Sequence, residues 1–254
     1  MKRQIWGLVI PTAFWICQGC STKPHYDKNL NNLSVVNGDT LENGYWEYTI
    51  SNNNVSKKGY FKNGIRSGEW LYKTNRDSQV FEWVIDTIGH DAFNIPRQFI
   101  RKKPKSPEIF LGDVDDGDPL TYLIVLRYDL DKQDASLNDY LIASYKAWRS
   151  DTTEYLVDKV GSRIYFRDIN LVRLETKFKR GEKTYHAISY IFKVDKALYD
   201  LTYRNIDANF GGIEKEVLQD ILYGSKIGGR DLFYYNNRRY LKEEPITFAE
   251  EEGT

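Results

Sequence analysis

The stretch from residue 172 to residue 194 reads VRLETKFKRGEKTYHAISYIFKV and decides the fold. From 172 to 178, apolar or β-branched residues alternate with charged ones, which is the period of a strand with one buried face. Arg180-Gly181-Glu182 predicts a turn. The returning strand presents its core face through Ile188, Tyr190, Phe192 and Val194. Two such strands joined by a short turn pair antiparallel, so the chain contains an antiparallel sheet.

Further strands are predicted on both sides of this hairpin. The segment 120–130, LTYLIVLRYDL, is a nearly continuous apolar run, typical of a central strand covered on both faces. Shorter strands are predicted at 80–85, 93–96 and 198–203. Pro96 ends the second of these because proline cannot donate to a strand ladder.

Two helices accompany the strands. Ser136 and Asp139 resemble a capping box, and apolar residues recur at helical spacing through 136–149. A second helix begins near Gly212 and ends near Gly224. The order of strands, helix, meandering strands and helix predicts an α+β fold in which an antiparallel sheet is packed with two main helices.

This order of elements resembles the PsbP-like fold. The shared landmarks are the strand ending Asn94-Ile95-Pro96, the helix at 136–149, the segment Tyr185–Tyr190 and the closing strand and helix at 198–224. The resemblance extends over residues 79–235. It implies a binding or assembly factor, because members of that family are mostly non-catalytic.

A repeat precedes this region. Gly44-Tyr45-Trp46-Glu47-Tyr48 recurs 24 residues later as Gly68-Glu69-Trp70-Leu71-Tyr72, with GYFKNG at 59–64 between them. Aromatic residues two apart share one strand face, and Asn63-Gly64 is a tight-turn signal, so the repeat predicts a small module of β-hairpins. The pattern over 44–73 resembles MORN-type repeats, which implies an interaction role. The candidate interaction surface is Trp46, Tyr48, Tyr60, Trp70 and Tyr72. In the alternative, Trp46, Tyr48, Trp70 and Tyr72 form the core of the hairpins.

The N-terminus reads MKRQIWGLVIPTAFWICQGC. Two basic residues precede an apolar run of about a dozen residues, too short for a permanent membrane span, and Gly19 precedes Cys20. This order resembles the bacterial lipoprotein signal. The resemblance implies cleavage after residue 19, a lipid on the thiol of Cys20 and a place in the bacterial cell envelope. Ser21 favours the outer membrane over the inner one by the same resemblance.

Two alternatives for this segment stay open. The apolar run could be an uncleaved anchor, or Cys17 and Cys20 could form a redox CxxC pair. The pattern here departs from the lipoprotein signal at Cys17 and Gln18, where leucine and a small residue are usual. Residues 20–37 are polar and predict a flexible tether, and residues 236–254 predict a C-terminal tail that ends in an acidic run.

Composition excludes some classes of function. The formal net charge is zero, and loss of Lys2 and Arg3 with the signal would leave −2. The chain therefore lacks the excess of positive charge that is typical of proteins that bind nucleic acid. No cysteine follows Cys20, so the body contains no disulfide framework and no cysteine metal site. Aromatic residues make up 15% of the chain, which favours β structure.

No motif for catalysis or for a cofactor occurs. We find no HExxH pair, no Gly-x-Ser-x-Gly elbow and no phosphate-binding loop. His25 falls in the tether, His90 starts a strand, and His186 alternates in phase with Ile188, which predicts a core position. Gly211-Gly212 before a helix could offer N–H groups to an anion. The acidic residues around Gly117 suggest a calcium loop only weakly, because their spacing departs from the EF-hand pattern.

The sequence therefore predicts a signal peptide at 1–19, a tether at 20–37, MORN-like hairpins at 38–78, a PsbP-like domain at 79–235 and a tail at 236–254. The leading hypothesis is a non-enzymatic, lipid-anchored envelope protein that binds a protein partner, with no cofactor and no metal. An antitoxin or immunity-like protein is the second hypothesis. An envelope hydrolase with two carboxylates in a cleft is the third.

Overall fold

The fold is that of a computed structural model, which describes residues 32–36, 39–50, 54–101, 108–113, 118–130, 136–150, 153–233, 238 and 241–248. The predicted signal peptide, Cys20 and the tether up to residue 31 lie outside the described residues. Within the described ranges, no helix has the length and apolar character needed to span a membrane.

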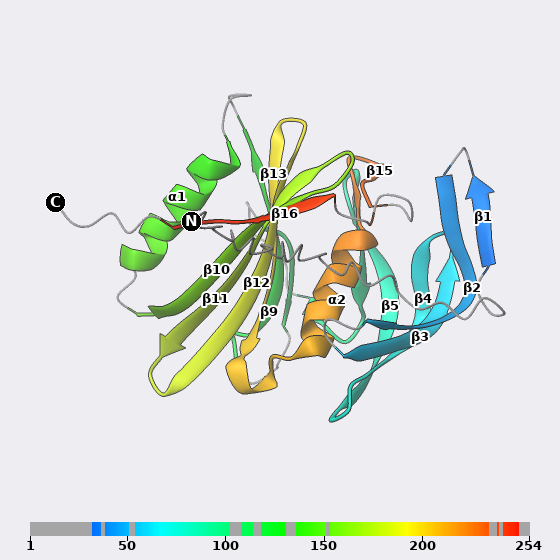
Figure 1. Cartoon of the computed structure of the whole chain (residues 1–254), viewed down its shortest axis with the longest axis horizontal. Helices are drawn as coiled ribbons and strands as arrows, with labels where there is room; N and C mark the ends of the chain where they lie inside the picture. Colours follow the sequence, from blue (N-terminus) through cyan, green and yellow to red (C-terminus); the bar gives the residue numbers. More distant parts are fainter. Residues whose placement is uncertain are drawn as a thin grey trace, which may run out of the picture.

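Two eight-stranded sheets form the body, and every strand pair in the first sheet is antiparallel. The order of the first sheet is β1-β2-β3-β4-β5-β6-β14-β15, and Figure 1 shows it curling on one side of the molecule. Its strands are β1 Asn32–Val36, β2 Asp39–Ile50, β3 Val55–Lys62, β4 Ile65–Lys73, β5 Ser78–Ile88, β6 Asp91–Pro96, β14 Lys226–Ile227 and β15 Arg230–Asp231.

The second sheet has the order β16-β10-β11-β12-β13-β9-β8-β7 and is also antiparallel. Its strands are β7 Ile100–Arg101, β8 Glu108–Asp113, β9 Tyr122–Asp129, β10 Tyr155–Tyr165, β11 Asn170–Arg180, β12 Lys183–Val194, β13 Ala197–Ile206 and β16 Lys242–Pro245. The helical elements are α1 Leu137–Ser150, the 3-10 helix η1 Asp207–Asn209 and α2 Gly212–Tyr223.

The helices cover opposite faces of the second sheet. Figure 1 shows α1 on its outer side and α2 on the other side, between the two sheets. Leu141 of α1 packs in a small core with Val172, Leu174, Ile191 and Leu198. A larger core joins α2 to both sheets, and its helix residues are Ile213, Val217, Leu218, Ile221 and Leu222.

The α+β prediction and both predicted helices are confirmed. At the start of α1, the Ser136 N–H donates to the Asp139 carboxylate at 2.9 Å, and the Asp139 N–H donates to Ser136 Oγ at 3.2 Å. These two bonds are the capping box that the sequence predicted. The second helix begins at Gly212 and is followed by Gly224.

The prediction of a single core face for the hairpin at 172–194 is incomplete. Val172 pairs with Ile191, and the side chains of 172 and 174 pack with Leu141 of α1. Ile188 and Tyr190 lie on the opposite face, in the core with α2. Both faces of this sheet are covered, and each strand therefore contributes to two cores.

The boundaries of the structural units also differ from the predicted ones. β5 and β6 belong to the first sheet, because β5 continues the ladder of β4 with Trp70 opposite Phe81. The chain passes from the first sheet to the second between Pro96 and Ile100. The predicted boundary between the hairpin module and the PsbP-like domain was at residue 78. β1 lies within the predicted tether 20–37, and β16 lies within the predicted tail 236–254 and pairs with β10.

Candidate functional site

The aromatic repeat is mostly interior. Trp46, Tyr48, Trp70 and Tyr72 are each at most 8% exposed, whereas Tyr60 is 58% exposed. The predicted interaction surface is therefore wrong for four of its five residues, and the alternative of a hairpin core is correct for them. Aromatic residues two apart did share a strand face, but that face turns inward onto α2.

The local geometry explains the glycines of this repeat. Asn63 and Gly64 have φ of 54° and 77°, the left-handed backbone of a tight hairpin turn between β3 and β4. A Cβ on Gly59 would lie 2.4 Å from Cδ2 of Trp70, so only glycine lets the indole pack on this strand. The hairpin prediction for 59–72 is confirmed.

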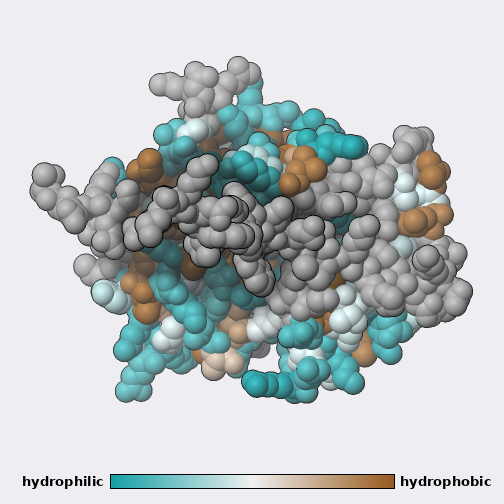
Figure 2. Space-filling model, in the orientation of Figure 1, coloured by the Kyte–Doolittle hydropathy of each residue, from teal (hydrophilic) through white to brown (hydrophobic). Residues whose placement is uncertain are grey.

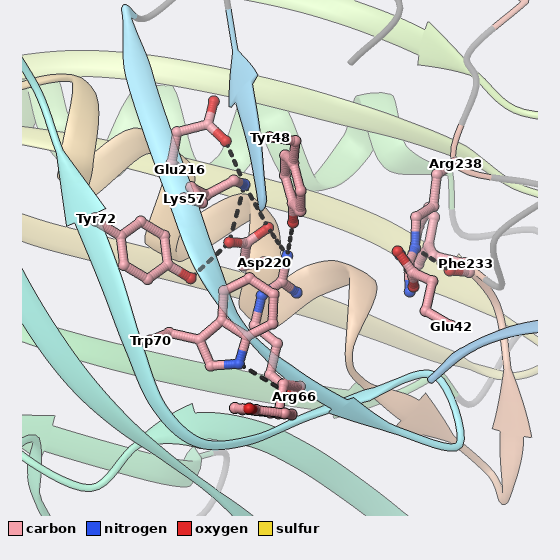
Figure 3. A network of polar contacts seen from close by, with 11 residues as sticks. Glu42, Tyr48, Lys57, Arg66, Trp70, Tyr72, Glu216, Asp220, Phe233 and Arg238 are labelled. Atoms are coloured by element: carbon pink, nitrogen blue, oxygen red, sulfur yellow. Dashed lines mark hydrogen bonds and ion pairs between the residues drawn. The ribbon is translucent and has the colours of Figure 1, made fainter. Parts of the chain in front are cut away.

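A buried cluster of charged side chains joins this sheet to α2 (Figure 3). Lys57 of β3 places its Nζ 2.6 Å from Glu216 Oε2 and 2.9 Å from Asp220 Oδ1. Arg66 of β4 places Nη2 2.6 Å from the same Asp220 oxygen. All four side chains are at most 3% exposed. We call Lys57, Arg66, Glu216 and Asp220 the interior charge cluster.

Aromatic side chains surround the interior charge cluster. Tyr72 donates its hydroxyl to Asp220 at 2.6 Å, and Tyr48 accepts from Arg66 at 2.7 Å. The Arg66 guanidinium lies 4.8 Å from the ring centre of Trp70, a cation–π distance. The cations are therefore held by both carboxylates and rings.

The sequence places these groups by simple periodicity. Lys57 alternates in phase with Val55 and Phe61 on the inward face of β3. Glu216 and Asp220 are four residues apart, so both lie on one side of α2. Sequence reasoning missed the cluster because each charged residue looks solvated when read alone. The available signal was a lysine at an inward strand position and two acids within an apolar helical stripe.

The electrostatics favour the charged forms of the cations. Burial by itself lowers the pKa of Lys57, but Asp220 and Glu216 outweigh burial and raise it above its ordinary value. The same holds for Arg66, where Asp220 opposes the effect of burial. Burial and the adjacent Asp220 both raise the pKa of Tyr72, which keeps its hydroxyl protonated as a donor.

The interior charge cluster can be compared with the hypothesis of an envelope hydrolase that uses two carboxylates in a cleft. Glu216 and Asp220 are close and buried, as a catalytic carboxylate pair would be, but both hold the ammonium of Lys57. A cavity of about 340 Å³ lies elsewhere, between the start of α1 and the hairpin of β10 and β11. Neither carboxylate lines that cavity. Its Tyr165 donates to Glu244, and its Arg163 donates to Asn138.

The histidines and the Gly211-Gly212 pair were the other candidates for a functional role in the sequence. His186 is 6% exposed, its Nε2 lies 2.8 Å from Glu175 Oε1, and its ring stacks on Phe210. This confirms its predicted core position. His90 is exposed at the turn after β5, and His25 lies outside the described residues. The Gly211 N–H donates to the Glu214 carboxylate at 2.8 Å, so a side chain of α2 takes the place that an anion would have at this N–H.

Two acidic residues of the loop are described, Asp113 at the end of β8 and Asp118 before β9. Asp118 is buried and accepts from Lys183 at 2.8 Å and from Tyr185 at 2.9 Å. Asp115 and Asp116 lie outside the described residues. Among the residues that the structure does describe, no cluster of three or more acidic, histidine or cysteine side chains could hold a metal ion.

The surface offers a different feature, a group of exposed apolar side chains on one strand. On the face that Figure 2 displays, coloured residues are mostly hydrophilic and apolar ones occur in small separate areas. On β10, however, Tyr155, Val157 and Val160 are 73%, 53% and 59% exposed. β16 pairs only with residues 162–165 of this strand. The described chain continues past β16 along this strand, with Phe248 beside Gly161 and its ring centre 5.2 Å from Nζ of Lys159. We call Tyr155, Val157 and Val160 the exposed apolar residues of β10.

No family model matches the sequence, and no curated protein matches it. The chain is similar to the solution structure of cyanobacterial PsbP (CyanoP) from Synechocystis sp. PCC 6803, with 14% sequence identity and a TM-score of 0.43. The match covers 58% of this chain and 92% of that one. The similarity concerns the course of the backbone, and the MORN-type and lipoprotein resemblances stay predictions.

Proposed function

We propose that this chain is a lipid-anchored protein of the bacterial envelope whose folded body binds a protein partner without catalysing a reaction. The observation that carries the proposal is the group of exposed apolar residues of β10, where three apolar side chains are more than half exposed on one strand. Apolar side chains gathered at the surface of one strand are a liability that proteins normally suppress, so their presence favours an interaction site.

The disposition of the acidic and basic groups supports binding over catalysis. His186 of β12 contacts the partly exposed Glu175 of the neighbouring strand β11. Glu216 and Asp220 neutralise buried cations of the first sheet. These groups stabilise the contact between the two sheets and α2. A reaction would need an acid, base or nucleophile that faces a substrate.

The anchor is tested by metabolic labelling with radioactive palmitate. Cells that make the wild-type chain are compared with cells that make Cys20→Ser and Cys17→Ser. We expect label on the wild type and on Cys17→Ser, and loss of label from Cys20→Ser, because the lipid is placed on the thiol of Cys20. An unlabelled wild-type chain would remove the anchor, and with it the predicted preference for the outer membrane.

Binding is tested separately by photo-cross-linking in cells. A photoreactive amino acid replaces Tyr155 or Val160 in the full chain, and the matched control replaces Ile142, which is 53% exposed on α1. We expect a discrete cross-linked protein from the two positions on β10 and none from position 142. A partner of the toxin class would favour the immunity-like alternative. The same products from all three positions would contradict the proposal.

A further inference from the structure

We infer that the cavity between the start of α1 and the strands β10 and β11 binds a small organic acid that also carries hydroxyl groups, with its carboxylate on the guanidinium of Arg163. The inference goes beyond the proposed function, because it concerns a small molecule and a different surface of the chain. It depends on the size and rigidity of the cavity, the contacts of Arg163 and the kinds of side chain around it.

The cavity has the size of a site for a small molecule. Its volume is about 340 Å³. Pockets that hold small ligands usually measure about 300–1,000 Å³, so this cavity suits a ligand at the small end of that class. Its described lining comes from the first turn of α1, the last residues of β10 and the first residues of β11.

Paired strands and a capped helix hold the walls of the cavity in place. Arg163 lies opposite Val172 of β11 on one side and opposite Glu244 of β16 on the other. At the start of α1, the Ser136 hydroxyl donates to the Asp139 carboxylate at 2.8 Å, which fixes the first turn. Side chains on such elements are placed more precisely than side chains on loops, so the cavity is formed before a ligand arrives.

Arg163 is the only charged side chain among the described residues that line the cavity. Its Nη2 donates to Oδ1 of Asn138, which is a neutral acceptor. Within the described part of the chain, no carboxylate forms an ion pair with this guanidinium. A guanidinium carries five N–H donors in a planar fork that matches the two oxygens of a carboxylate. Most of these donors are therefore available to a carboxylate that enters the cavity.

Glu244 does not take the place of this ligand. It lies opposite Arg163 in the ladder, but it is not one of the residues that line the cavity. Its carboxylate accepts from the Tyr165 hydroxyl at 2.7 Å and pairs with Lys242 of the same strand. Because Lys242 balances the charge of Glu244, Arg163 remains as a positive charge at the cavity.

The other lining residues define the rest of the ligand. The Asn138 amide uses its oxygen for Arg163 and keeps its N–H donors. The exposed Asn170 amide both donates and accepts, as a hydroxyl group does. Leu137 and Val172 add apolar surface for C–H groups. A sugar acid combines a carboxylate, several hydroxyl groups and a C–H face on one small ring, and it therefore fits this set of side chains.

The probes are glucuronate and galacturonate, each titrated into the full chain and followed by its amide signals in NMR spectra. Glucose and galactose are the matched sugars without a carboxylate. We expect at least one of the two acids to bind with a Kd below about 1 mM, and its neutral sugar to bind at least about tenfold more weakly. The amide signals of 136–138 and 170–172 should shift, and those of the exposed apolar residues of β10 should not.

Two variants locate the binding. Arg163→Met removes the charge and should weaken the acid at least about tenfold. The matched control is Arg173→Met, because Arg173 is an arginine of the neighbouring strand that pairs with Glu243 and does not line the cavity. The control should bind with unchanged affinity. Circular dichroism verifies that each variant is folded.

Three results would overturn the inference. They are no binding of either acid up to about 1 mM, equal binding of the acids and the neutral sugars, and unchanged affinity in Arg163→Met. None of them affects the proposed function, since the cross-linking test uses positions 155 and 160, which do not line the cavity.

Discussion

Replacing Lys57 with methionine should cost the protein much of its stability. The change removes one of two cations from the interior charge cluster and leaves Glu216 and Asp220 with Arg66 as the remaining cation. Because all these groups are at most 3% exposed, water cannot compensate. Breaking a buried ion pair in this way lowers the free energy of unfolding by about 3–5 kcal/mol, against a typical total of roughly 5–15 kcal/mol.

Combining Lys57→Met with a second substitution tests the charge balance of the interior charge cluster more stringently than the single variant does. Glu216→Gln removes one carboxylate and leaves an excess positive charge, whereas Lys57→Met leaves an excess negative charge. The double variant retains the Arg66–Asp220 pair at 2.6 Å and is neutral again. The double variant should therefore lose less stability than the two single variants together, with a coupling of about 1–3 kcal/mol.

The assay is denaturant unfolding followed by tryptophan fluorescence. Trp70 and Trp83 are suitable probes because their rings lie 4.8 and 5.5 Å from the Arg66 guanidinium. The matched control is Arg230→Met, which breaks an ion pair to Asp195 whose side chains are 56% and 76% exposed. That change should cost less than about 1 kcal/mol. Additive single and double variants, or a Lys57→Met cost no larger than the control, would refute the reasoning.

Two further predictions concern the close packing at Gly59 and the pH dependence of stability at Glu175. Gly59→Ala places a Cβ 2.4 Å from Trp70 Cδ2 and should destabilise the fold by about 1–3 kcal/mol, while Ser67→Ala on the exposed side of β4 should have little effect in the same unfolding assay. The hydrogen bond from His186 and the proximity of Lys215 outweigh burial and lower the pKa of Glu175 from 4.5 to about 2. The stability it contributes is therefore present above pH 4.5 and lost as the pH falls toward 2, and Glu175→Gln should flatten unfolding stability across that range. An unchanged pH slope in this variant would count against the assignment.

Local chemistry made part of the fold predictable. The alternation at 172–178, the turn at Asn63-Gly64 and the capping box at Ser136 each depend on residues within a few positions of one another, and each is present in the structure. Such features follow from strand and helix periods and from backbone preferences. These local features determine which segments form strands and which form helices. They do not determine which other parts of the chain pack on those strands and helices.

The candidate site was not predictable by the same means. Lys57 and Glu216 are 159 positions apart, and each looks like a solvent-exposed charge in its own segment. Only the placement of α2 against β3 makes them partners. The aromatic repeat shows the same difficulty, since Trp70 and Tyr72 alternate equally well whether their face is open or covered.

The position of α2 has a consequence for the repeat as a module. β14 and β15 follow α2 and complete the first sheet beyond β6, so that sheet is built from both ends of the described chain. Residues 38–78 alone would leave Lys57 and Arg66 without their carboxylates and would expose the faces of Trp46 and Trp70. The repeat is therefore one part of a larger cooperative body, and its contacts with Glu216 and Asp220 can form only once residues up to 220 are available.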